Sequence, residues 1–313
     1  MTPNTMNLKN SLYLIPFLTS VFILSGCASF GEGVGQGVAN AVLEKTEAED
    51  TRVCQVWGQA FDGIDHSLLQ QKGKTKVLMT HGVGAHEPGY STEFMEKLAA
   101  ELDLTIRSES SKNISLTSPT NQDKKLGNLR VTRYSDKNKT RTMLSYELTW
   151  SEITADQKAL LAFDNSGEYS FRRTEVNNLM KTFSNDTGPD PIIYLGKSRP
   201  DILTAFGQSY CWMAQGDWED LPSQYGRPVC STSEDPEHVS EHIKNDDFVF
   251  ISHSLGSRIT IDGMQKIASD IGKQQTGELH HKEIAPQKVI DALREKEITL
   301  FMLSNQLPML QLG

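Results

Sequence analysis

Two short apolar segments, each ending in small residues and followed by a helical pattern, constrain the fold of this chain most strongly. Residues 76–80 (KVLMT) lead into a glycine loop, HGVG, and residues 247–251 (DFVFI) lead into the turn SHSLG. Continuous apolar runs of this length are typical of strands that are buried on both faces, as in a parallel sheet. Helical patterns begin at Ser91 and at Ser257. Strand, tight turn and helix in succession predict an α/β fold with a mostly parallel sheet and flanking helices.

Other segments complete this outline. Residues 128–135 and 142–149 alternate polar with apolar side chains, which predicts a hairpin or two neighbouring strands. Residues 298–303 form a third apolar strand. Helical spacing covers residues 39–71, 152–184 and 284–295. The polar residues 106–127 predict an exposed loop, and the proline-rich residues 186–240 predict irregular or short-helix structure, as in an insertion.

Composition narrows the class of protein. The chain has 313 residues, a length that permits one large domain or two modest ones. Its 40 acidic and 31 basic residues give a net charge of −9. Binding to nucleic acid needs clustered Lys and Arg to neutralise phosphates, so this acidic balance argues against nucleic acid as a partner.

The first 26 residues have the composition of a targeting segment. Lys9 is their only charge, and residues 11–24 are nearly all apolar. A run of 14 residues is too short to span a bilayer, which takes about 20, but it fits the apolar region of a signal peptide. It ends in Leu24-Ser25-Gly26-Cys27, which resembles the lipobox of bacterial lipoproteins. The alternative is a buried helix with an incidental cysteine, and the start can be either Met1 or Met6.

The lipoprotein resemblance implies a location and a membrane partner. The chain would be cut before Cys27, whose thiol carries lipid, and several acyl chains such as palmitate would anchor it firmly. Because Lys9 is removed, the mature net charge is −10. Ala28 after the cysteine implies the outer membrane of a Gram-negative bacterium, facing the periplasm or the surface. Residues 27–50, rich in glycine at the start, form a tether, and residues 51–313 form the folded domain.

In such a location the cysteines can form disulfides, because the cell envelope is an oxidising compartment. With Cys27 lipidated, Cys54, Cys211 and Cys230 are left. Cys211 and Cys230 are the natural pair, since they close a short loop, and Cys54 is then the odd thiol. Three free thiols are an equally good interpretation.

The turn that follows the strand at 247–251 resembles the nucleophile elbow of the α/β-hydrolase superfamily, G-x-S-x-G. Gly256 supplies the second small residue, and Ser252 replaces the first glycine. The resemblance implies that Ser254 is the nucleophile and that the Leu255 backbone N–H is an oxyanion donor at the helix N-terminus. The alternative is a small-residue turn without catalysis.

The earlier loop HGVG resembles the oxyanion loop of the same family. The resemblance implies that the second oxyanion donor is the Val83 N–H, or alternatively that of Gly84. His81 is then expected to hold the loop in place. A metal site of His81, His86 and Glu87 has poor ligand spacing, so we expect neither a metal nor a cofactor.

The distance between the two motifs predicts a large insertion. Gly84 and Ser254 are 170 positions apart, about 100 more than two helices and a strand require. The excess is expected to form a hairpin and a helical cap over approximately residues 153–240. Apolar residues there would line a cap for an acyl substrate or form a small core: Trp212, Met213, Trp218, Leu221 and Tyr225.

The motifs together predict a lipid-anchored serine hydrolase, similar to esterases or lipases, that cleaves carboxylic esters through an acyl-serine intermediate. Only 59 residues follow Ser254, and none is a convincing catalytic acid or base. His280 and His281 lie in a polar stretch, His253 lies inside the turn, and Asp262 lies two turns along the helix. Either the chain is C-terminally incomplete, or it is a non-catalytic binding or structural module with the same fold. The oligomeric state stays open.

Overall fold

The computed structural model describes residues 55–56, 58–61, 63–69, 73–107, 111–161, 175–222, 229–278 and 285–304. The expected signal peptide, lipidated Cys27 and tether lie outside these residues. The chain divides into two compact units, Met1–Ala60 and Phe61–Gly313. None of the described helices is long and apolar enough to cross a membrane.

The described part of the first unit is a short hairpin. β1 (Gln55–Val56) pairs antiparallel with β2 (Gln59–Ala60). The helix expected over residues 39–71 is therefore wrong at these positions. Gly58 has a φ of +78°, a left-handed conformation that glycine adopts without strain and that suits a tight turn. Within the expected range, helix α3 (Gly63–Leu69) belongs to the second unit.

The second unit is an α/β structure built on a curled, mixed sheet of seven strands. Its order is β4-β6-β7-β3-β8-β9, and β5 pairs with β6. β7, β3, β8 and β9 run parallel, whereas β6 is antiparallel to β4, β5 and β7. The strands are β3 (Thr75–Thr80), β4 (Thr105–Ile106), β5 (Lys112–Ser118), β6 (Asn121–Ser135), β7 (Thr142–Thr149), β8 (Asp247–His253) and β9 (Ile298–Leu303).

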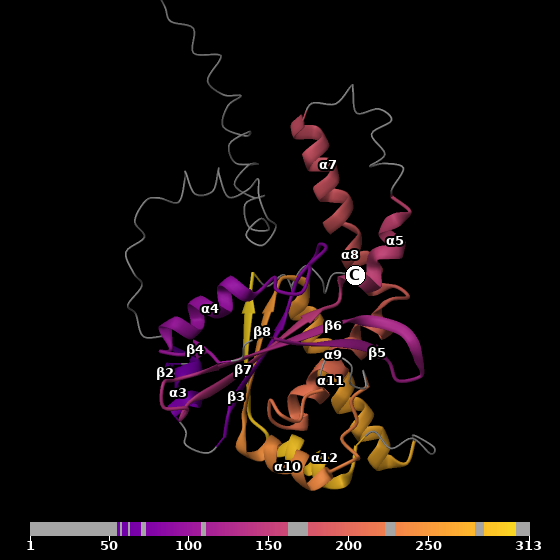
Figure 1. Ribbon diagram of the computed structural model, residues 1–313. Helices are drawn as coiled ribbons and strands as arrows, with labels where there is room; N and C mark the ends of the chain where they lie inside the picture. Colours follow the sequence, from indigo (N-terminus) through magenta and orange to yellow (C-terminus); the bar gives the residue numbers. More distant parts are fainter. Residues whose placement is uncertain are drawn as a thin grey trace, which may run out of the picture. The chain divides into compact units, whose positions relative to one another are not determined.

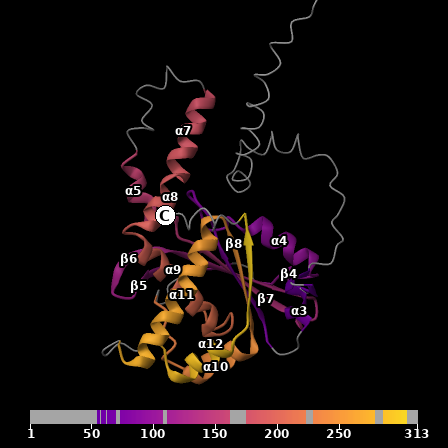
Figure 2. The ribbon, with the colours of Figure 1, turned by 180° about the vertical axis from the view of Figure 1, so that it is seen from behind.

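Helices cover both faces of the sheet, as Figures 1 and 2 show from opposite sides. α3 and α4 (Thr92–Glu101) lie on one face. On the other face lie α9 (Arg199–Gln215), α10 (Pro236–Asn245), α11 (Leu255–Thr276) and α12 (Gln287–Glu295). In β3, Val77 and Met79 pack on the first side and Leu78 on the second. This alternation divides the core into two layers.

The strands expected at 76–80, 247–251 and 298–303 are confirmed, and so is the pairing of 128–135 with 142–149, which are neighbours in β6 and β7. The loop expected at 106–127 is wrong, because β5 and the first part of β6 form a hairpin there. Ile114 and Leu116, separated by an exposed serine, are buried on one face of the sheet. Their period-two pattern was hidden among polar residues.

The irregular structure expected over 186–240 is also wrong in one place, because α9 is a 17-residue helix that packs on the sheet. Pro200 lies in its first turn, where a missing N–H costs nothing. Trp212, Met213 and Leu221 are buried in the main core, so they are core residues rather than a cap. Trp218 packs against that core, and Tyr225 lies outside the described residues.

A separate group of helices stands at the carboxyl end of the parallel strands (Figure 1). It consists of the 3-10 helix η2 (Ser151–Thr154), α5 (Ala155–Ala159), α7 (Glu175–Thr187) and α8 (Pro189–Leu195). These helices fall within the range expected for a cap. Their large exposed apolar side chains are Leu160, Leu179, Met180, Phe183, Ile192 and Leu195.

Candidate active site

The sheet places the two sequence motifs next to each other. β3 and β8 are parallel neighbours, with Thr80 opposite Ser252, so the loops that leave their carboxyl ends begin side by side. After β3 the chain passes through β4, β5 and β6 to β7 on one side of β3, and from β7 it crosses to β8 on the other side. In open α/β sheets, such a reversal leaves a crevice at the carboxyl ends of the strands, where ligands bind.

Ser254 has an unusual backbone conformation at the junction of β8 and α11. Its φ is +51° and its ψ is −121°, a combination that residues with a side chain rarely adopt. Such strain costs of order 1–3 kcal/mol and persists only where the surrounding structure enforces it. Its N–H donates to the Leu303 carbonyl at 3.0 Å, and its side chain is 6% exposed. The strained turn is the conformation expected of a nucleophile elbow.

Two glycines permit the close packing around this turn. A Cβ on Gly82 would lie 2.8 Å from the Ser254 Cβ and 3.0 Å from the His253 carbonyl oxygen. A Cβ on Gly256 would overlap the carbonyl oxygens of Thr80 and His81. Glycine is therefore required sterically at both positions, and the HGVG loop lies directly against Ser254.

Ser252 replaces the usual first glycine without disturbing the turn. It is fully buried, and its hydroxyl lies 3.1 Å from Ser257 Oγ and 3.2 Å from the Phe301 carbonyl oxygen. The hydroxyl is thus satisfied inside the fold, so a serine is accommodated at this position.

His81 is held by hydrogen bonds on both ring nitrogens. Its Nε2 accepts from the Trp150 backbone N–H at 3.2 Å, so the proton is on Nδ1, which donates to the Gly82 carbonyl at 2.9 Å. The Trp150 indole stacks on the ring, with centroids 4.7 Å apart. Burial holds the pKa of His81 well below its usual value. A neutral imidazole with both nitrogens engaged positions the loop and cannot accept a proton from serine.

The two candidate donors in the HGVG loop differ in availability. The Gly84 N–H donates to Asp190 Oδ2 at 2.7 Å, so it cannot point at an oxyanion, which corrects its use as the alternative donor. The Val83 N–H makes no hydrogen bond to any residue in the described part of the chain. Leu255 begins the 22-residue α11, where the first N–H groups have no partner within the helix. Of the N–H groups expected to act as oxyanion donors, those of Val83 and Leu255 are therefore not engaged by the hydrogen bonds described here.

Two buried carboxylates, Asp190 and Glu147, hold the segment that follows β3. The sequence did not point to either of them. Asp190 on α8 is fully buried and also pairs with Lys158 Nζ at 2.9 Å. Glu147 on β7 accepts hydrogen bonds from the N–H groups of Gly89 and Ser91 and from the Ser91 hydroxyl. The Ser91 side chain therefore bonds to β7 rather than capping α4. Glu147 occupies a polar position in the alternating pattern of its strand, so no signal in the sequence indicates that its side chain is buried.

The structure does not complete a catalytic triad within the described residues. Asp262 is engaged with Tyr194 Oη at 2.6 Å and with the Arg199 and Arg258 guanidinium groups at 2.9 and 3.0 Å. His253 lies beside Gly82, and burial lowers its pKa. The hydrogen bonds of His81, His86, His238 and His242 go to groups other than Ser254 Oγ. His280 and His281 lie outside the described residues.

Cys211 on α9 and Cys230 form a disulfide, with their Cα atoms 5.9 Å apart. The bridge joins the end of α9 to the segment that leads into α10, so it closes the loop that carries Asp217 and Asp220. Cys54 lies outside the described residues.

Comparisons with known proteins do not assign the chain to a family. No protein-family model matches the chain. No curated protein and no solved structure has significant similarity to it.

Proposed function

We propose that this protein is a serine hydrolase of the α/β-hydrolase type that cleaves carboxylic esters, with Ser254 as its nucleophile. One observation carries the proposal: Ser254 occupies a strained strand-to-helix turn, and Gly82 of the HGVG loop packs against its Cβ. Few other roles explain why a fold would hold a serine in this conformation beside a glycine loop.

The proposed reaction follows acyl-transfer chemistry. Ser254 Oγ attacks the ester carbonyl carbon, its proton passes to a general base, and the carbonyl oxygen becomes an oxyanion. The Val83 and Leu255 N–H groups and the positive end of the α11 dipole stabilise that charge. Collapse of the intermediate releases the alcohol, which takes up the proton, and leaves an acyl-serine. Water then attacks the acyl carbon and releases the carboxylic acid.

An apolar acyl substrate suits the surroundings of the site. Exposed apolar side chains lie on α7 and α8, the helices that carry Asp186 and Asp190, which accept hydrogen bonds from the N–H groups of Ala85 and Gly84. Exposed apolar patches at a binding site are typical of proteins that bind apolar ligands or surfaces. A lipoprotein anchored through Cys27 would meet lipid esters at the cell envelope, as the sequence suggests.

A fluorophosphonate probe tests the nucleophile. It forms a bond between Ser254 Oγ and phosphorus and releases fluoride. We expect the full-length protein to be labelled and to hydrolyse p-nitrophenyl esters, and both activities to disappear in Ser254→Ala. Ser240→Ala, at a buried serine of α10, is the matched control and should keep both. Labelling that persists in Ser254→Ala, or none in the native protein, would contradict the proposal.

The second candidate function is a non-catalytic binding or structural module. It is favoured by the engagement of both ring nitrogens of His81 and of the Asp262 carboxylate with groups other than Ser254. This module would be folded by circular dichroism yet inert to both the probe and the ester. The two outcomes of the same experiment therefore separate the two functions.

A further inference from the structure

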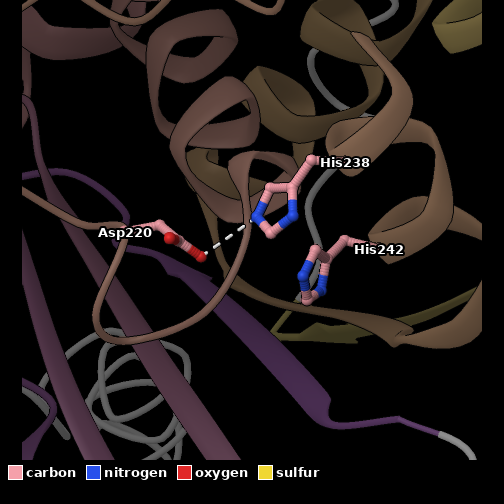
Figure 3. Close-up of side chains that lie close together, drawn as sticks. All are labelled: Asp220, His238 and His242. Atoms are coloured by element: carbon pink, nitrogen blue, oxygen red, sulfur yellow. Dashed lines mark hydrogen bonds and ion pairs between the residues drawn. The ribbon is translucent and has the colours of Figure 1, made fainter. Parts of the chain in front are cut away.

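A cluster of metal-ligating side chains lies away from Ser254 and is independent of the function proposed above. α10 supplies His238 and His242, which are four positions apart and so share one face of the helix. The turn after α9 supplies Asp220. One ligand atom from each of the three residues lies within 4.8 Å of the others. Figure 3 shows the two imidazoles next to each other and the Asp220 carboxylate facing His238.

The spacing of these atoms suits a small transition-metal ion. His238 Nε2 and Asp220 Oδ2 are 3.2 Å apart, and the two imidazole centroids are 4.5 Å apart. Zinc bonds of about 2.0–2.1 Å in a tetrahedral arrangement place neighbouring ligand atoms roughly 3.3 Å apart. A metal ion can therefore replace the proton that His238 and Asp220 share, with only small movements of the side chains.

A second carboxylate orients His242. Asp246 forms an ion pair with Lys76, and a carboxylate accepts hydrogen bonds, so His242 Nδ1, 3.0 Å from Asp246 Oδ2, is the donor. Lys76 Nζ, at 2.7 Å, and the Lys74 N–H, at 2.9 Å, hold the carboxylate in place. This leaves His242 Nε2 as the ligand atom, the arrangement that metal-binding histidines usually have.

Gly216, the residue that follows α9, has no side chain and so leaves space for the proposed ligand atoms. A Cβ on Gly216 would overlap Asp220 Oδ2 and lie 2.9 Å from His238 Nε2. The Asp217 N–H donates to Asp220 Oδ2 at 2.7 Å and so fixes the carboxylate. Asp217 Oδ1 is a buried atom without a hydrogen bond in the described part of the chain, and it lies 3.9 Å from His242 Nδ1. The other oxygen of this carboxylate, Oδ2, forms an ion pair with Lys74.

We propose that Asp220, His238 and His242 bind one Zn²⁺ ion, with a water molecule as the fourth ligand. Asp246 immediately precedes β8, and Ser254 immediately follows it. The seven residues of β8 between them make eight steps of extended chain, about 25 Å, so the ion does not act on the serine. Its role is to join the turn after α9, which lies within the loop closed by Cys211 and Cys230, to α10 and, through Asp246, to the start of β8.

Binding of Zn²⁺ alone to the tag-free, full-length protein in detergent, with Cys54 alkylated, tests this site. We expect competition with a chromophoric chelator to give one equivalent of Zn²⁺. Asp220→Asn and His238→Ala should each weaken binding by at least about tenfold. Glu237→Gln removes an exposed carboxylate of the same helix that pairs with Lys288, and it should bind as the native protein does. Substitution with Co²⁺ should give the visible absorption of a tetrahedral N/O site.

Three results would overturn the site: no Zn²⁺ bound by the native protein, unchanged affinity in folded Asp220→Asn, or an octahedral Co²⁺ spectrum. Circular dichroism shows whether each variant is folded. Should His238→Ala fail to fold, Asp220→Asn decides, since it preserves the size of the side chain. The melting temperature should also rise with added Zn²⁺ in the native protein and in Glu237→Gln, and not in Asp220→Asn.

Discussion

At the scale of single residues, Gly82 is the position on which the geometry around Ser254 depends most. Gly82→Ala places a Cβ 2.8 Å from the Ser254 Cβ, so the turn or the loop must shift. Displacement of a reacting group by about 1 Å can lower a rate on the order of 100-fold, and we expect fluorophosphonate labelling to slow by that factor. Gly272→Ala is the control, because Gly272 lies on α11 with open space around it. Equal labelling rates in the two variants would contradict the packing described here.

Three histidines around the loop predict how stability depends on pH. Burial is the largest cause of a lowered pKa in His81, His86 and His253. The folded protein therefore keeps them neutral, whereas the unfolded chain binds protons below about pH 6.5. The free energy of unfolding should fall as the pH drops from 7 to 5, by up to about 1.4 kcal/mol per pH unit for each histidine.

Urea denaturation at several pH values, with a chelator present, measures this slope. His81→Gln keeps an acceptor for the Trp150 N–H but cannot be protonated, so its slope should be shallower than that of the native protein. Identical slopes in the two proteins would show that His81 does not contribute.

At the scale of elements, α8 holds the HGVG loop through one buried carboxylate. Asp190→Ala frees the Gly84 N–H and leaves Lys158, whose side chain is only 13% exposed, with the more exposed Asp186 as its ion-pair partner. Removing one member of a buried pair costs about 3–5 kcal/mol of unfolding free energy. Asp186→Ala, whose side chain is 41% exposed, should cost about 1 kcal/mol at most. Chemical denaturation of both variants measures the difference, and comparable losses would count against the role of Asp190.

At the scale of the whole molecule, the predicted anchor determines where the domain acts. Several acyl chains on Cys27 bind a bilayer far more tightly than a single chain does. The expected net charge of −10 adds no attraction to anionic lipids. We therefore expect the protein to stay in the membrane fraction in high salt, and Cys27→Ser to lose the lipid mass on its N-terminal peptide. Extraction of the native protein by salt alone would contradict the anchor.

Much of the sheet follows from local sequence, and the exceptions have a physical cause. The apolar runs that became β3, β8 and β9 are buried on both faces or lie beside such strands, so their composition alone indicates them. β5 was missed because only Ile114 and Leu116 mark its buried face, and the pairing with β6 supplies the rest of its stability. α9 was missed because the residues around it are rich in proline and have the composition of a loop. Its stability comes mainly from tertiary packing, which local sequence does not show.

The sequence by itself determined the α/β class, the order of the two motifs and the identity of Ser254 as the candidate nucleophile. Each depends on residues close together in the chain, where steric requirements are local. Only the tertiary structure decided which N–H groups are available, because Gly84 is engaged by Asp190 from 106 residues away. It also brought Asp220 to the two histidines of α10, since the ligands of such a cluster come from separate elements that only folding makes adjacent.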